Sequence, residues 1–297
     1  MKPSGNRHPA AEFLPAALLL AFAVWAAHFW HFRQFGIYED DWGFVAVPMF
    51  WNWQDALRTF WLYLTTWPQG RPVSFVASGF LAFAGTHLGG LPGAYFAGFL
   101  LNAGTTVLFY AALCRCFRAP VAFCGALAVT LFPAYSAATL LTNTFMPGVS
   151  LFFMVLTIWF YLRNRRLATY LASAFTILSY ESCFLPLFAL PLLEATSWPR
   201  LRREMLRHCS ILAAIAAVAF SVRGSIGEPK VATFTSHFSD SLSRVVQAIY
   251  LGPRTALYSW LQTPLRLWNE RTPEVELFVL IMIPILALAL WYLATRP

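Results

Sequence analysis

The stretch LATYLASAFTILSYESCFLPLFALPLL (residues 167–193) decides how this chain folds, because it has two interpretations. Its residues are apolar, small or hydroxyl-bearing, and Glu181 near the middle is the one charged side chain. As a single helix, the stretch would be one long, tilted membrane span. As two helices that meet near Tyr180-Glu181, each half has about 14 residues and a length of about 21 Å. Such a half is shorter than a hydrocarbon core about 30 Å thick.

The composition of the whole chain indicates a membrane protein. Of 297 residues, 59% are hydrophobic and 11% are charged, and the mean hydropathy is +0.58. A soluble domain has about 25% charged residues. Because too few polar side chains are available to cover a water-exposed surface, lipid must solvate much of this chain. We therefore expect an all-α integral membrane protein.

Hydropathy predicts a series of spans along the chain. The N-terminal run has a basic head, is too long for a signal-peptide core and lacks a convincing small-residue cleavage site, so we expect it to be a retained first span. The candidate spans are 13–32, 92–113, 119–136, 145–162, 167–193, 208–224 and 275–293, with a further apolar stretch at 72–88.

The basic residues between these segments select one topology. The clusters are Lys2/Arg7, Arg115/Arg118, Arg163/Arg165/Arg166, Arg200/Arg202/Arg203/Arg207 and Arg296. All of them lie in the cytoplasm, as the positive-inside rule requires, only if 167–193 crosses twice and 72–88 does not cross fully. This arrangement gives about eight spans with both termini cytoplasmic. The alternative, with 72–88 as a full span and 167–193 as one tilted helix, separates Arg115/Arg118 from Lys2/Arg7.

The eight-span topology puts two long loops, 33–91 and 225–274, on the external side. The first contains MFWNWQDALRTFWLYLTTW (residues 49–67), in which aromatic and leucine side chains recur at helical spacing. This pattern is typical of a helix that lies in the membrane interface. The second loop mixes apolar and basic residues around Pro253 and Pro264, and we expect further interfacial helices there.

Four acidic residues are candidates for chemistry on that side. Glu39, Asp40 and Asp41 form a run in GIYEDDWGF (residues 36–44), close to the outer end of the first span. They are either reactive carboxylates or solvated residues that cap the next helix. Glu181 lies where the helix is expected to break, and an intramembrane acid is costly enough to suggest a function. Its alternative role is to pair with a buried arginine or a backbone donor.

Two arginines and two histidines complete the set of candidates. Arg71 in WPQGRPVSF (residues 67–75) and Arg223 near the end of span 208–224 suit phosphate binding, although both could also reach out to lipid phosphates. His28 and His31 are three residues apart and could bind a metal with the acids, but interface packing is the competing role. The five cysteines include no CxxC or Cys/His pattern, although Cys114-x-Cys116 leaves a metal conceivable.

The order of these motifs resembles the GT-C membrane glycosyltransferases, which include protein O-mannosyltransferases and aminoarabinose transferases. The matching residues are EDD at 39–41, GRPVS at 70–74 and YESCFLPL at 180–187, and the resemblance covers roughly residues 13–224. It implies a GT-C-like membrane module at 1–224 that includes the first external loop, 33–91. Residues 225–297 would add an external loop with interfacial helices and a last span.

The resemblance also implies a reaction. A sugar would move from a polyprenyl-phosphate donor to an acceptor hydroxyl on the external face, with inversion at the anomeric carbon. Asp40 would be the general base, and Asp41 or Glu181 would orient the acceptor. Arg71 and Arg223 would stabilise the departing phosphate, with Glu39 and Tyr180 also in the substrate site. No cofactor is required, although a divalent metal could lie between the acids.

Other functions stay open at this stage. A transporter or flippase for a lipid-linked substrate would also place charge in a broken helix, and a non-catalytic membrane subunit could use the acids to hold a partner. Nucleic-acid binding is excluded, because the basic residues lie in short clusters between apolar segments. The expected location is a bacterial inner membrane, with membrane lipids as partners. Neither the sugar nor the acceptor follows from the sequence.

Overall fold

A computed structural model describes residues 10–132, 140–193 and 197–229, together with short runs between residues 231 and 262. In the described residues the regular elements are helices and there is no strand. Four helical segments are long and apolar enough to cross a membrane: Phe13–Gln34, Pro72–Leu113, Leu141–Leu162 and Trp198–Ser225. The chain is thus an all-α membrane protein. The expected span 275–293, the end of 119–136 and most of loop 225–274 lie outside the described residues.

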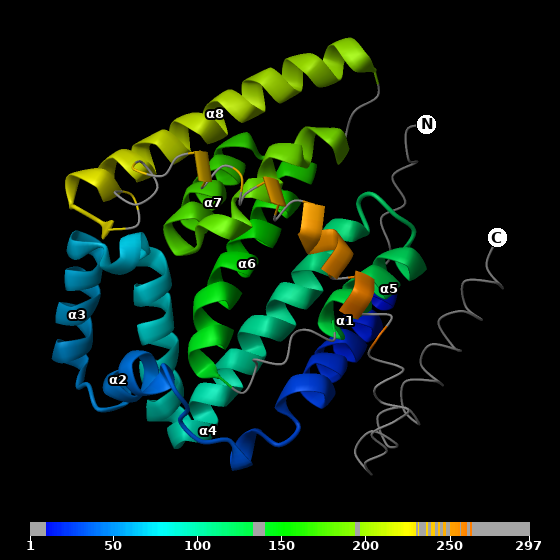
Figure 1. The fold of residues 1–297 in the computed structure, drawn as a ribbon. Helices are drawn as coiled ribbons and strands as arrows, with labels where there is room; N and C mark the ends of the chain where they lie inside the picture. The colour runs from blue at the N-terminus through cyan, green and yellow to red at the C-terminus, as the bar shows by residue number, and fades with distance from the viewer. Residues whose placement is uncertain are drawn as a thin grey trace.

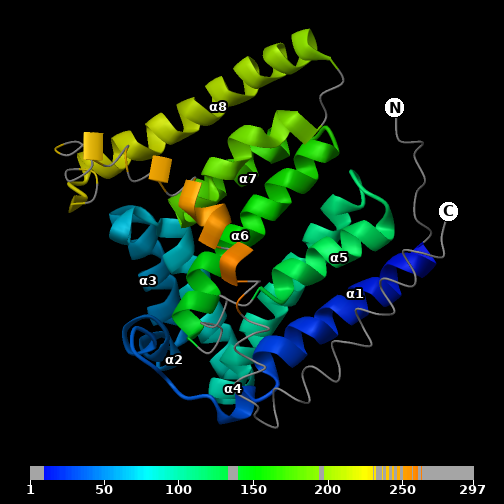
Figure 2. The same cartoon turned by 45° about the vertical axis from the view of Figure 1, so that its right-hand side comes forward.

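The helices form a bundle, and the short helix α2 and helix α3 lie at one side of it, against α4 (Figure 1). In Figures 1 and 2, α1, α4, α5 and α6 lie next to one another, α3 flanks α4, and α8 runs along one edge of the bundle. The bounds are α1 (Ala10–Val24), α2 (Val47–Met49), α3 (Trp53–Thr66), α4 (Pro72–Leu113), α5 (Ala119–Thr130), α6 (Leu141–Leu162), α7 (Arg166–Ser179) and α8 (Trp198–Ser225).

Helix α4 is a hairpin of two helical arms. Gly89 and Gly90 have non-helical dihedral angles, and Gly90 has φ of 63°. A Cβ on Gly85 would lie 2.7 Å from the Cα of Ala94, and one on Gly93 would collide with the Gly85 carbonyl. Residues nine apart in a straight helix are about 13 Å from each other, so the chain reverses here. The first arm, 72–88, and the second arm, 91–113, pack closely because glycines line their contact.

The second arm of α4 sets the register of its neighbours. It runs parallel to α6, because a Cβ on Gly98 would lie 2.8 Å from Thr144 and one on Gly148 would lie 3.0 Å from Leu101. It runs antiparallel to α1, whose Phe13 stacks on Tyr110 and whose continuation brings Phe29 against Phe99. It is also antiparallel to α5, where the Thr130 hydroxyl contacts Thr106.

The chain reverses at Tyr180-Glu181, as the two-helix interpretation predicts. Helix α7 ends at Ser179, and Tyr180 is extended, with φ of −156° and ψ of 118°. Residues 181–193 then continue as the 3-10 turns Glu181–Cys183 and Leu185–Leu193. These turns travel back beside α8, because the carbonyls of Leu187 and Phe188 accept hydrogen bonds from His208 and Cys209. The single tilted helix is therefore wrong.

The reversal lies part of the way along α6 and not at its end. The hydroxyl of Ser150, which is in the tenth residue of α6, donates to the carbonyls of Thr176 and Tyr180. Helix α7, at 14 residues, is only about 21 Å long. If α6 crosses the membrane, the short helix therefore stops at a depth inside it, next to protein partners that can satisfy the interrupted backbone.

The basic clusters of the described residues lie at one end of the bundle. Because the second arm of α4 and α6 are parallel, the loops at 114–118 and 163–165 are at the same end. An ion pair from Arg166 to Glu204, at 3.2 Å, brings the arginine-rich start of α8 there too. Segments α1, second-arm α4, α5, α6, α7, 181–193 and α8 alternate in direction. This alternation is the pattern that the eight-span topology needs, and the number of membrane crossings stays a prediction.

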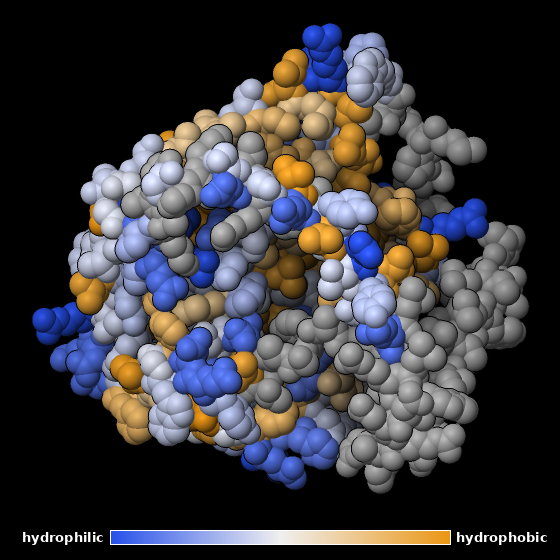
Figure 3. Space-filling view, in the orientation of Figure 1, coloured by the Kyte–Doolittle hydropathy of each residue, from blue (hydrophilic) through white to orange (hydrophobic). Residues whose placement is uncertain are grey.

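The outer faces of several helices are apolar, as expected in contact with lipid. Figure 3 shows tan and orange side chains along α8 at the upper edge of the molecule. Exposed apolar side chains occur on α1 (Leu14, Leu18, Leu19), α4 (Phe96, Leu100) and α8 (Leu206, Val218, Phe220). Helix α3 buries Ala56 against the first arm of α4 and exposes Trp53, Leu57 and Trp61. Ring contacts of Trp53 with Phe83 and of Tyr63 with Phe75 show that α3 runs antiparallel to the first arm of α4, and its place in the membrane interface stays a prediction.

Candidate functional site

Arg71 and Glu181 form a bidentate ion pair between α4 and the reversal after α7. The guanidinium Nε donates to Oε2 of Glu181 at 3.1 Å, and Nη2 donates to Oε1 at 2.9 Å. The guanidinium also lies over the ring of Tyr180, 3.7 Å from its centroid. Planar, two-point contacts of this kind fix the orientation of an arginine as well as its position.

A second ion pair joins Arg223, near the end of α8, to Glu228. Arg223 donates through Nε and Nη2 to the two carboxylate oxygens of Glu228, and both side chains are almost fully buried. The Nη1 atom of Arg223 lies 3.9 Å from Oε2 of Glu181, so the two pairs touch. We call Arg71, Tyr180, Glu181, Arg223 and Glu228 the arginine–carboxylate cluster.

The turn before α4 is shaped to admit this cluster. Trp67, Gln69 and Gly70 have positive φ values of 48°, 51° and 69°. A Cβ on Gly70 would collide with the guanidinium of Arg223 and would lie 2.7 Å from Oε2 of Glu228. Positive φ at non-glycine residues stores strain that surrounding contacts must hold. Glycine is required here for both its dihedral angles and its lack of a side chain.

The cluster contains two arginines and two glutamates, and these four side chains are not equally exposed. Arg71 and Arg223 are buried, whereas the side chain of Glu181 is 33% exposed. Burial disfavours the charged form of Arg71, but the hydrogen bonds and charge of Glu181 outweigh it and raise the pKa of Arg71 above its ordinary value. Arg71 is therefore a cation, and Glu181 is a charged member of the cluster that a ligand can reach.

The acidic run divides into one buried and two exposed residues. Asp41 is fully buried, and its carboxylate accepts hydrogen bonds from the backbone N–H groups of Leu141 at 3.0 Å and Thr142 at 2.7 Å. These are first-turn donors of α6, which have no partner within the helix. Asp41 thus caps a helix 100 residues away rather than the next one. Each of its oxygens accepts one backbone hydrogen bond at the start of α6, and a role in orienting the acceptor stays a prediction.

Asp40 and Glu39 are exposed at the same turn. Within the described residues no hydrogen bond to the carboxylate of Asp40 is present, so this group is available to an incoming hydroxyl. The acidic run and the arginine–carboxylate cluster are not in direct contact there. Along α6, Thr142 marks the level of Asp41 and Ser150 marks the level of Tyr180, which is a rise of about 12 Å.

The two histidines do not form a metal site with the acids. The ring Nε2 of His28 lies 2.7 Å from the carbonyl of Thr130, the last residue of α5, and satisfies that helix end. In the described residues no group of three or more His, Cys, Asp and Glu side chains could hold a metal ion. The packing role is the one that the structure supports for His28.

Sequence reasoning missed Glu228 and the role of Gly70. Glu228 follows the end of α8 and is separated from Arg223 by five residues, so helical spacing alone would not pair them. The tight chain path after Ser225, with Gly227 at φ of 72°, brings the carboxylate back. An acid soon after a basic helix end was the available signal.

Two buried guanidinium groups that converge beside an accessible carboxylate can bind an anion. An arginine has five N–H donors, and hydrogen bonds to the two glutamates use two on Arg71 and two on Arg223. Donors on both side chains are left for phosphate oxygens. Comparison with protein-family models, with curated proteins and with solved structures found no match for this chain.

Proposed function

We propose that this protein is a membrane glycosyltransferase that takes a sugar from a polyprenyl-phosphate donor and passes it to an acceptor hydroxyl on the external face. The observation that carries the proposal is the convergence of Arg71 and Arg223 on Glu181. A lipid-linked phosphate needs cationic partners within reach of the membrane, and these two come from separate elements of the bundle. The proposal rests on two things. The sequence resembles the GT-C enzymes, and the structure brings Arg71, Arg223 and Glu181 into contact.

In the proposed reaction the acceptor hydroxyl attacks the anomeric carbon of the donor sugar. Asp40 takes the hydroxyl proton, because its carboxylate is exposed and has no hydrogen bond in the described part of the chain. The bond from the anomeric carbon to the phosphate oxygen breaks, and polyprenyl phosphate leaves with the electron pair. Arg71 and Arg223 stabilise that anion. One displacement inverts the anomeric centre.

The remaining candidates, Asp41 and Glu181, hold other groups in place. Asp41 holds the turn that carries Asp40 against the start of α6, and Glu181 holds Arg71 in the orientation that Tyr180 also fixes. Because the attacking oxygen, the anomeric carbon and the phosphate oxygen are in line in one displacement, the reaction also requires Asp40 and the cluster to approach each other across the interval of about 12 Å along α6. The acceptor class stays open.

Native mass spectrometry of the protein in mild detergent, with a polyprenyl phosphate added, tests the phosphate site. We expect Arg71→Ala to weaken the adduct by about tenfold, which corresponds to about 1.4 kcal/mol. Arg58→Ala, on the exposed face of α3, should leave it unchanged. Equal adducts in wild type and Arg71→Ala, in protein that remains folded, would remove the cluster from donor binding.

Asp40→Asn tests the reaction separately from binding. We expect the variant to keep the adduct and to lose sugar transfer in membranes supplied with the lipid-linked donor, because an amide cannot accept the hydroxyl proton. Transfer at the wild-type rate would exclude Asp40 as the base.

A transporter or flippase is the second candidate, and the reversal at Tyr180-Glu181 favours it, since such proteins bind substrate where helices are interrupted. This function predicts that labelled polyprenyl phosphate moves between leaflets of vesicles that contain the protein, with Asp40→Asn still active. A non-catalytic subunit would tolerate amide substitutions at both Asp40 and Glu181.

A further inference from the structure

The described residues line a half-open cavity of about 460 Å³ away from the arginine–carboxylate cluster. Its walls come from α1, the second arm of α4, α5 and α6, of which α1, α4 and α6 belong to segments long and apolar enough to cross a membrane and α5 is a shorter apolar helix. Ser150 faces Tyr180, whereas Leu151 and Val155 of the same helix line the cavity. The cavity is therefore a separate feature of the bundle.

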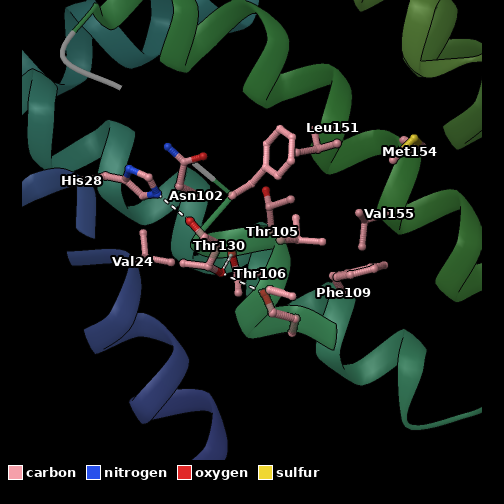
Figure 4. A pocket seen from close by; sticks show the side chains of 14 residues that line it. Val24, His28, Asn102, Thr105, Thr106, Phe109, Thr130, Leu151, Met154 and Val155 are labelled. Atoms are coloured by element: carbon pink, nitrogen blue, oxygen red, sulfur yellow. Dashed lines mark hydrogen bonds between the residues drawn. The ribbon is translucent and has the colours of Figure 1, made fainter. Parts of the chain in front are cut away.

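The lining is apolar over most of its area and has one polar end. Figure 4 shows His28, Asn102 and Thr130 on one side, with Phe109, Met154 and Val155 on the other. No Asp, Glu, Lys or Arg is among the described lining residues. A charged ligand would find no counter-charge there, so the occupant is neutral.

The polar end offers both a donor and an acceptor. The Asn102 amide gives one N–H to the Gly98 carbonyl at 3.3 Å, which leaves its second N–H and its carbonyl oxygen. The Thr130 hydroxyl gives its single proton to the Ala126 carbonyl at 3.0 Å, so in its 3.4 Å contact with Thr106 the Thr106 hydroxyl is the donor, and the Thr106 oxygen keeps a lone pair that can accept a hydrogen bond. A hydroxyl group, which donates and accepts at once, matches this pair.

The volume of the cavity limits the size of the apolar part of a ligand. Ligand pockets commonly measure about 300 to 1,000 Å³ and are mostly apolar with a few polar groups. Since a cavity of about 150 Å³ holds a benzene ring, this one has room for about 18 carbon atoms. Because its walls lie in membrane helices, what enters comes from the bilayer.

We propose that the cavity binds a neutral, single-chain lipid alcohol, with its hydroxyl at Asn102 and Thr106 and its chain toward Phe109 and Met154. The ligand is distinct from the phosphate-bearing donor, so this site does not depend on the proposed transfer reaction.

The test uses hexadecanol that carries a photoreactive diazirine in its chain, added to the full-length protein in detergent micelles. After illumination, peptide mass spectrometry should locate the label on the cavity segments of α4 and α6. Excess unlabelled hexadecanol should suppress the label, and hexadecane should do so about tenfold less well, because it lacks the hydroxyl.

Two variants and one control make the assignment specific. Ala128→Trp fills the cavity from α5 and should lower labelling about tenfold. Val121→Trp, on an exposed position of the same helix outside the lining, should leave it unchanged. Asn102→Leu should make hexadecane and hexadecanol equal competitors. Labelling that Ala128→Trp does not lower, or that a polyprenyl phosphate suppresses better than hexadecanol, would overturn the proposal.

Discussion

The carboxylate of Asp41 is buried and bonds the backbone N–H groups of Leu141 and Thr142, whereas Asp40 beside it is exposed. The two residues are chemically identical, and their different roles come from which one faces the start of α6. A helix cap at this site stabilises by about 0.5–2 kcal/mol, since two first-turn donors would otherwise be buried without partners. Asp41 is thus a structural carboxylate beside a reactive candidate.

Asp41→Ala should lower the free energy of unfolding by about 2 kcal/mol. Asp41→Asn keeps one good acceptor and should lose about half as much. Chemical denaturation in detergent, followed by circular dichroism, measures both, and Asp40→Asn is the control that should be neutral. A neutral Asp41→Ala would show that the α6 cap does not contribute to stability.

The pair Arg71–Glu181 is more buried than the pair Arg166–Glu204, whose side chains are 31% and 30% exposed. A double-mutant cycle with Arg71→Ala and Glu181→Ala should give a coupling of about 1–2 kcal/mol, after allowance for the partial exposure of Glu181. The cycle for Arg166 and Glu204 should give less than about 1 kcal/mol. Equal couplings would mean that the cluster behaves as an ordinary surface pair.

At the scale of elements, the turn Trp67–Gly70 and the hairpin at Gly89–Gly90 determine where α4 begins and reverses. Both depend on backbone angles that favour glycine. The turn also carries Arg71 to the reversal after α7, so the geometry of the cluster is set by backbone as much as by charge.

Gly70→Ala should destabilise the protein by about 2 kcal/mol or more, because the added Cβ is strained at φ of 69° and meets Arg223. Gly104→Ala, in the second arm of α4, has nothing within 4 Å and should stabilise by about 0.5–1 kcal/mol. Thermal unfolding of the two variants under the same conditions measures the difference. A Gly70→Ala variant as stable as wild type would contradict the close packing of the turn on α8.

At the scale of the whole molecule, the eight-span topology predicts that Glu181 is reached from the external side and that the basic loops are reached from the cytoplasm. In a variant with the native cysteines replaced, a cysteine at position 181 should react with a membrane-impermeant reagent added outside intact cells. A cysteine at position 203 should react only after the cells are opened. Labelling of position 181 from the cytoplasmic side alone would exclude the eight-span topology.

The sequence by itself determined the helical membrane class and the break near Tyr180-Glu181, and it singled out Arg71 and Glu181, which the structure pairs, because hydropathy, charge position and proline are local signals. Only the tertiary structure decided that Asp41 caps α6, that Glu228 holds Arg223, that His28 closes α5 and that four helices leave a cavity. Each of these depends on contacts between residues whose approach is set by the packing of whole helices. The spacing of residues along the chain does not predict that packing.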